Sequence, residues 1–215
     1  MTEALALTTL VVAFVCGLLV CEARDSKRAA LVCKSAASAG FVAVAWVLGA
    51  PERGAFGAFI LVGLVLSATG DVALALHSRR SFLFGLVAFL LGHVAYIAAC
   101  AVVVPFRQWL GPVVALPVVT TTAAYVVLSP RLGSLRGPVI AYMGAITVMV
   151  IGAIAFRDAG AAHGDALLLG AFLFYVSDLS VARDRFVQRA FVNRAWGLPA
   201  YYAGQLLLAW AARSG

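Results

Sequence analysis

Eight apolar runs, each about 20 residues long, constrain this 215-residue chain more than any other feature of its sequence. They cover roughly residues 3–22, 29–48, 55–76, 81–104, 110–128, 137–156, 163–182 and 195–212. A helix of about 20 residues crosses the hydrocarbon core of a bilayer, whereas a membrane β-strand needs only about ten residues of alternating polarity. Only helices and closed barrels satisfy their backbone hydrogen bonds in hydrocarbon. The sequence therefore predicts an all-α, polytopic membrane protein, a bundle of about eight transmembrane helices.

The share of charged residues supports the membrane assignment. Hydrophobic residues make up 64% of the chain and charged residues only 12%, about half the charge of a typical soluble domain. A soluble domain of this size has no place for so many apolar side chains in one core. The net charge of +7 does not indicate nucleic-acid binding, because the basic residues lie in short gaps between apolar runs.

The distribution of basic residues predicts the orientation. Twelve of the 16 Lys and Arg residues lie in the first, third, fifth and seventh loops or at the start of the second span, and four lie on the other side. Cytoplasmic loops carry the excess of Lys and Arg in membrane proteins. We therefore expect the odd-numbered loops in the cytoplasm, both termini on the non-cytoplasmic side, and a multi-pass protein of the cell (inner) membrane.

The loops are too short to separate domains, so residues 1–215 are predicted to form one transmembrane domain. The third and seventh spans share a weak sequence similarity. Gly63 stands eight residues before Asp71, and Gly170 stands eight residues before Asp178. Two four-helix repeats, about 1–104 and 110–213, would explain this similarity, as parallel repeats do in other membrane proteins. The alternative is coincidence in a chain rich in Ala, Gly and Val.

Ionisable and polar groups inside the apolar runs are the candidate functional residues, because each is costly in lipid unless it is paired or faces water. Counted from the nearest basic loop at about 1.5 Å per residue, the aspartates and the lysine lie roughly 7–12 Å inside the predicted cytoplasmic boundary. Tyr202 falls in the same layer, and His93 and Gln205 are deeper. We expect one water-accessible pocket near that boundary. Its candidate residues are Lys34, Asp71, His93, Asp178, Tyr201, Tyr202 and Gln205.

Several of these residues also have a purely structural interpretation. Lys34 could pair with one aspartate or extend to the interface, and His93 could be an interhelical hydrogen-bond partner. Tyr201 and Tyr202 could belong to an interfacial aromatic belt. Arg183, Asp184 and Arg185 are predicted to form a solvated loop.

Two buried carboxylates at similar depth favour acid catalysis. Burial disfavours the ionised form, and a second carboxylate nearby disfavours it further. One aspartate is then expected to hold a proton while the other polarises water or stabilises a cation. Such an aspartate dyad suits hydrolysis through a proton-generated cationic intermediate.

Other catalytic devices are missing from the sequence. A zinc hydrolase needs several histidines close together, but His77 and His163 fall on opposite sides of the predicted topology. There is no GxSxG nucleophile motif and no glycine-rich phosphate loop. No metal or organic cofactor is expected.

The residues resemble those of the YhhN-like lysoplasmalogenases, a family of integral membrane alkenyl ether hydrolases. The similarity runs from about residue 28 to the end of the chain. Lys34 matches an early lysine of the family's second span, although Ser35 stands where the family usually has proline. The other matching segments are GDVALAL (Gly70–Leu76), FLFGLVAFLLGHVAY (Phe82–Tyr96), YMGAITVMV (Tyr142–Val150), GAFLFYVSDLSVARDRF (Gly170–Phe186) and YYAGQLLLAW (Tyr201–Trp210).

The resemblance implies hydrolysis of the vinyl-ether bond of lysoplasmalogens to a fatty aldehyde and a glycerophospho-head group such as glycerophosphoethanolamine or glycerophosphocholine. It implies that Asp71 and Asp178 are catalytic, one as the acid and one as the stabilising group. Lys34, with Arg79 or Arg80, would hold the phosphate. Further polar contacts to the lysophospholipid or its water would come from His93, Tyr201, Tyr202 and Gln205.

Three other functions remain open at this stage. Buried Asp, His and Lys residues also build the relays of proton- or ion-coupled transporters. Two membrane aspartates also serve intramembrane aspartyl proteases, although the glycine spacing of those enzymes is missing here. A non-catalytic lipid-binding protein is the third alternative, and it would tolerate loss of an aspartate.

Overall fold

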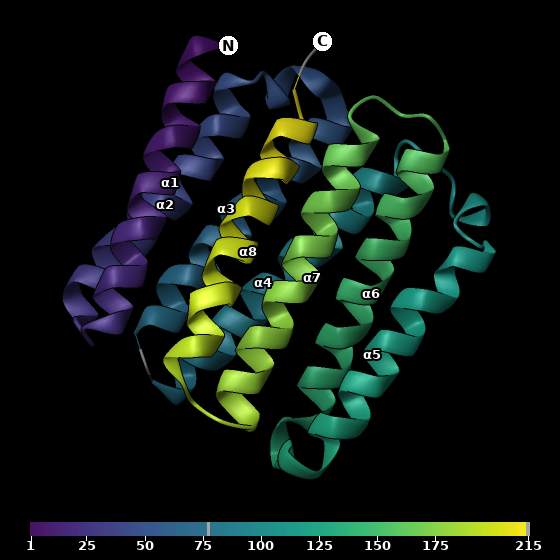
Figure 1. Cartoon of the computed structure of the whole chain (residues 1–215). Helices are drawn as coiled ribbons and strands as arrows, with labels where there is room; N and C mark the ends of the chain where they lie inside the picture. Colours follow the sequence, from purple (N-terminus) through teal and green to yellow (C-terminus); the bar gives the residue numbers. More distant parts are fainter. Residues whose placement is uncertain (77, 214–215) are drawn as a thin grey trace.

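The computed structural model describes residues 1–76 and 78–213, and His77, one of the histidines considered for a zinc site, lies outside them. This part of the chain contains eight long helices and no strand, so the all-α prediction is confirmed (Figure 1). The helices are α1 (Thr2–Ala23), α2 (Lys27–Val47), α3 (Gly54–Ala75), α4 (Arg79–Ala101), α5 (Ala115–Leu128), α6 (Arg136–Asp158), α7 (Gly164–Phe186) and α8 (Phe191–Ala211).

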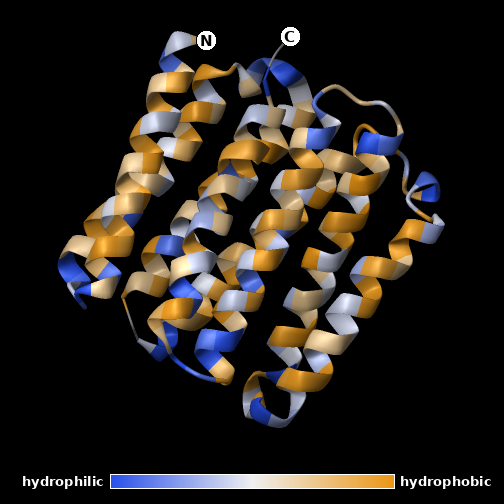
Figure 2. Cartoon of the chain, in the orientation of Figure 1, coloured by the Kyte–Doolittle hydropathy of each residue, from blue (hydrophilic) through white to orange (hydrophobic). Residues whose placement is uncertain are grey.

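Consecutive helices run in opposite directions, and both termini lie at the same end of the bundle (Figure 1). The loops α1–α2, α3–α4, α5–α6 and α7–α8 lie at the opposite end, which we call the basic end because it holds most of the Lys and Arg residues. Hydrophobic residues cover most of the helix lengths, and hydrophilic residues concentrate towards the loops (Figure 2). The cytoplasmic placement of the basic end stays a prediction.

Seven helical segments are long and apolar enough to cross a membrane, which makes the chain a multi-pass membrane protein. Helix α8 is the eighth long helix and falls below that apolar standard, although it has 21 residues. Polar residues lower the mean hydropathy of α8, among them Asn193 and Gln205. Both of these side chains are completely buried. These two polar side chains therefore face the protein rather than lipid.

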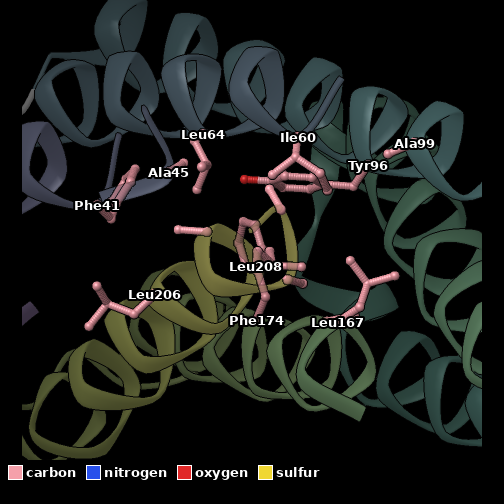
Figure 3. Packing of buried hydrophobic residues seen from close by; sticks show 14 of the residues in the cluster. Phe41, Ala45, Ile60, Leu64, Tyr96, Ala99, Leu167, Phe174, Leu206 and Leu208 are labelled. Atoms are coloured by element: carbon pink, nitrogen blue, oxygen red, sulfur yellow. The ribbon is translucent and has the colours of Figure 1, made fainter. Parts of the chain in front are cut away.

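Close packing of two helix hairpins forms the centre of the bundle. The most extensive packing between helices is that of α3 with α4 and that of α7 with α8. Small residues permit this, since a Cβ on Gly204 would lie 2.9 Å from the Gly170 carbonyl oxygen. Figure 3 shows side chains of α2, α3, α4, α7 and α8 meeting in this core, among them Phe41, Leu64 and Phe174. The four-helix repeat stays a prediction.

Helix α5 lies at the periphery and differs from the predicted span. It begins at Ala115 rather than at residue 110, because short 3₁₀ turns at Phe106–Gln108 and Pro112–Val114 precede it. Its packing contacts are few, α6 is its main partner among the long helices, and it leaves Leu116 and Val119 more than half exposed.

The end of α7 corrects a second prediction. Arg183, Asp184 and Arg185 form the last turn of this helix instead of a solvated loop. Asp184 accepts hydrogen bonds from the Ala190 backbone N–H at 3.0 Å and from Asn193 Nδ2 at 3.2 Å. Through these hydrogen bonds Asp184 fixes the start of α8. The pattern of apolar residues in the sequence does not reveal this role.

Candidate active site

A large cavity lies at the basic end of the bundle, and we call it the basic-end cavity. Its volume is about 1030 Å³, and residues from all eight helices line it. Asp71 of α3 and Asp178 of α7 both contribute to its wall. The structure therefore brings the two predicted aspartates to one chamber, in agreement with their predicted common depth.

Asp71 is surrounded by donors from three other positions. Its Oδ2 accepts hydrogen bonds from Ser38 Oγ and from Tyr201 OH, each at 2.7 Å. Its Oδ1 lies 3.4 Å from Lys34 Nζ, which completes an ion pair between α2 and α3. The Asp71 side chain is only 3% exposed, so α2 and α8 enclose this carboxylate almost completely.

Asp178 has a different environment on the same wall. Its Oδ2 accepts one hydrogen bond from Tyr142 OH at 2.8 Å, and His93 Nε2 lies 3.7 Å from the same oxygen. The Asp178 side chain is 17% exposed. It is therefore the more accessible of the two carboxyl groups.

The hydrogen bonding of His93 defines its tautomer. Nδ1 lies 2.6 Å from the Phe89 carbonyl oxygen, and since a carbonyl only accepts, Nδ1 must carry the hydrogen. In the neutral ring, Nε2 is then a bare acceptor that faces Asp178, and it has no hydrogen-bond partner among the described residues. The ring is fully buried and packs against Tyr142 and Phe174.

Cationic side chains line the cavity at the basic end. Arg194 pairs with Glu22 at 3.2 Å, and the Arg185 guanidinium lies 4.3 Å from the centre of the Phe82 ring. Guanidinium groups bind phosphate through several charge-assisted hydrogen bonds. The lining cations are Lys27, Lys34, Arg79, Arg131, Arg185, Arg189 and Arg194, and the lining acids are Glu22, Asp71, Asp178 and Asp184.

An apolar arm of the cavity extends between α4, α5, α6 and α7. Thr121 and Tyr175 line its far part, where their hydroxyl oxygens lie 3.1 Å apart. Because these hydroxyls bond to each other, they need no polar group from a ligand. The remaining wall of the arm consists of Leu83, Leu86, Val139, Met143 and Ile146.

Four of the predicted substrate-binding residues, Arg80 among them, are not on the cavity wall. Within the described part of the chain, Tyr202, Gln205 and His93 lie behind it. Tyr202 OH is 3.2 Å from Ser38 Oγ, and Gln205 Oε1 accepts a hydrogen bond from Tyr96 OH at 2.8 Å. These residues support the wall rather than form it.

The remaining predictions divide in a similar way. Tyr201 lines the cavity, and both Tyr201 and Tyr202 are buried, so neither belongs to an aromatic belt. Arg79 lines the cavity, whereas its neighbour Arg80 lines a separate shallow hollow beside α3. Lys34 pairs with Asp71, as one of the two structural interpretations expected.

Ser38 and Tyr142 are site residues that the sequence analysis missed. Ser38 lies one helical turn after Lys34, on the same face of α2. Tyr142 opens one of the segments that carry the family resemblance. These two features could have identified Ser38 and Tyr142 as site residues. They were missed because hydroxyl groups are common in membrane helices and are less conspicuous than charges.

No three His, Cys, Asp or Glu side chains form a group able to hold a metal ion within residues 1–76 and 78–213. The described residues offer two carboxyl groups in different surroundings. Asp71 is held by several donors, whereas Asp178 faces the acceptor nitrogen of His93. Such a pair is suited to proton transfer coupled to charge stabilisation.

Comparisons with known proteins agree with the sequence pattern. The YhhN family profile matches residues 29–212. Bovine lysoplasmalogenase TMEM86A is 32% identical over 163 residues, which are 71% of this chain and 64% of that protein. Human lysoplasmalogenase TMEM86A is 31% identical over 162 residues, with the same two shares. A lysoplasmalogenase of Mycobacterium bovis is 32% identical over 176 residues, 77% of this chain and 62% of the relative.

The matched region thus spans less than two thirds of the length of these curated relatives. No solved structure matches the chain.

Proposed function

The chain belongs to the YhhN family, and from this premise we propose that it hydrolyses the vinyl-ether bond of lysoplasmalogens. The products are a fatty aldehyde and a glycerophospho-head group, such as glycerophosphoethanolamine or glycerophosphocholine. The observation that carries the proposal is the presence of Asp71 and Asp178 on the wall of one cavity that has a cationic end and an apolar arm. The relatives named lysoplasmalogenase support the choice of substrate.

The lining of the basic-end cavity fits a single-chain phospholipid. Seven cationic side chains, including Lys34 and Arg79, line it against four acidic ones, which favours a phosphate. The apolar side chains of the arm, Leu83, Leu86 and Ile146 among them, suit the alkenyl chain. A lipid bound this way places its vinyl ether, which joins head group and chain, between these two regions. In the proposed complex, Asp71 and Asp178 of the same cavity wall act on this bond.

Acid catalysis of an enol ether needs one proton and one water. A carboxylic acid transfers its proton to the β-carbon, forming a C–H bond and an oxocarbenium ion. Water adds to the cationic carbon and returns a proton to the carboxylate, and the resulting hemiacetal separates into aldehyde and alcohol. One aspartate of the dyad donates the proton, while the other stabilises positive charge and orients water. This step uses only groups that the chain carries.

The same proposal includes the cellular setting. The basic end faces the cytoplasm by the distribution of Lys and Arg, in the cell (inner) membrane. The cationic part of the cavity then lies at the level of cytoplasmic lipid head groups, where a lysophospholipid can enter without leaving the membrane.

The decisive experiment compares two substrates. Purified protein is incubated with an alkenyl lysophospholipid and with its saturated alkyl counterpart, and aldehyde is measured. We expect aldehyde from the alkenyl lipid alone and a loss of at least about 100-fold in Asp71→Asn and in Asp178→Asn. Asp165→Asn, an exposed position on the same helix as Asp178, is the matched control and should keep full activity.

The result also separates the alternatives. A transporter would move protons or ions across proteoliposomes and leave the added lipid unchanged. An intramembrane protease would cleave a peptide rather than the lipid. Aldehyde release that is unaffected by both aspartate substitutions would refute the two-aspartate mechanism.

A further inference from the structure

The two aspartates of the cavity differ in what surrounds them, and the difference bears on their roles in the proposed hydrolysis. Both oxygens of Asp71 are occupied by donors: Oδ2 by two hydroxyls and Oδ1 by Lys34. Three donors, one of them cationic, stabilise the ionised form of a carboxylate. A proton on Asp71 would remove the negative charge that pairs with Lys34, and it would be shielded from a substrate, since the side chain is 3% exposed.

Asp178 has a contrasting set of neighbours. It receives one hydroxyl hydrogen bond, from Tyr142, and faces His93 Nε2 at 3.7 Å. His93 donates its Nδ1 hydrogen to the Phe89 carbonyl, so the neutral ring presents a lone pair towards Asp178. An ionised carboxylate would then oppose another acceptor in a buried place, which is unfavourable. A protonated carboxyl group removes this conflict.

Access to the substrate points the same way. The Asp178 side chain is 17% exposed and lies on the cavity wall, so its proton can reach a β-carbon in the chamber. Resting on the proposed hydrolysis, we infer that Asp178 is the proton donor and that Asp71 stays ionised throughout the reaction. His93 is a positioning residue that keeps the proton on Asp178 before the substrate binds.

With Asp178 as the acid, every proton of the reaction is accounted for. The O–H bond of Asp178 breaks as the C–H bond at the β-carbon forms, and the new Asp178 carboxylate lies beside the oxocarbenium ion. Water adds to this ion, and the proton that it releases returns to Asp178. Asp71, held by Ser38, Tyr201 and Lys34, contributes a fixed negative charge and loses no proton in the cycle.

Infrared spectroscopy tests the assignment without depending on activity. A protonated carboxyl group has a carbonyl stretch that is well separated from carboxylate bands. We expect wild-type protein at neutral pH to show such a band that is lost in Asp178→Asn and kept in Asp71→Asn. Loss in Asp71→Asn alone, loss in both variants or loss in neither would overturn the assignment.

Two further measurements examine His93 and the function separately. His93→Gln replaces the bare nitrogen by an amide that can donate to Asp178, so the acid band should weaken and kcat should fall at least about tenfold while KM is unchanged. A fall in kcat with an intact acid band would refute the positioning role. If wild-type protein releases no aldehyde, the proposed function fails, whereas the infrared bands still report which aspartate holds the proton.

Discussion

Lys34 Nζ lies 3.4 Å from Asp71 Oδ1, joining α2 and α3 by an ion pair inside the bundle. Removing one partner of a buried pair leaves the other charge uncompensated, which costs about 3 kcal/mol or more. We therefore expect Lys34→Met to lower the thermal unfolding temperature in detergent clearly, although methionine fills a similar volume.

A double-mutant cycle checks the physical cause. In the Asp71→Asn background no carboxylate is left unpaired, so adding Lys34→Met should cost far less. An equal loss of stability in both backgrounds would mean that Lys34 stabilises the fold by packing alone.

The glycine contact between α7 and α8 gives a second prediction. A methyl group on Gly204 would lie 2.9 Å from the Gly170 carbonyl oxygen and 3.1 Å from Phe174 N. Both are backbone atoms, so the helices would have to move apart. Overpacking of this kind costs about 1–3 kcal/mol, and Gly204→Ala should unfold at a lower temperature.

The matched control is Gly144→Ala on α6, where an added Cβ meets nothing within 4 Å. Alanine favours helix more than glycine by up to about 1 kcal/mol, so this variant should be as stable as the wild type or more so. Equal destabilisation by the two substitutions would contradict the packing argument.

The helices could be predicted from sequence because about 20 successive apolar residues leave few alternatives in a bilayer. The common depth of Asp71 and Asp178 followed from the same helical rise, and the structure brings both to one cavity. Helix rotation could not be predicted in this way. Gln205 sits at a suitable depth, yet it faces Tyr96 in the core instead of the cavity.

The rotation of a membrane helix depends on which small residues let its neighbour approach, and this is a property of pairs of helices. It also explains why Tyr142 was missed, since its importance comes only from facing Asp178 of another helix. The positions of Arg79 and Arg80 differ for the same reason. Successive residues of a helix point about 100° apart, so Arg79 can face the cavity while Arg80 points elsewhere.

These two arginines provide a third prediction. Arg79 lines the basic-end cavity, and Arg80 lines the shallow hollow beside α3. If the cationic part of the cavity holds the phosphate of the lysophospholipid, Arg79→Gln should raise KM several-fold and leave kcat unchanged, the pattern of lost uniform binding. Steady-state aldehyde release at several lipid concentrations measures both constants.

Arg80→Gln is the control, because it removes the same charge from the adjacent position. It should leave both constants unchanged. An equal rise of KM in the two variants would indicate a general electrostatic attraction of the lipid instead of a specific contact.

The apolar arm leads to a prediction about chain length. Ile146 on α6 is 3% exposed and lines the arm, whereas Val148, two residues later, points away and is 38% exposed. A larger side chain at position 146 takes space from the alkenyl chain, and each methylene that loses its place forgoes about 0.8 kcal/mol of transfer free energy. Ile146→Trp should therefore shift the preference from long to short alkenyl lysophospholipids, read as the ratio of kcat/KM for two chain lengths. Val148→Trp is the control, because it adds the same group on the outer side of α6, and it should leave the ratio unchanged. The ratio compares two substrates on the same protein, so a partial loss of folded enzyme cancels from it. An unaltered ratio in Ile146→Trp would show that the alkenyl chain lies elsewhere.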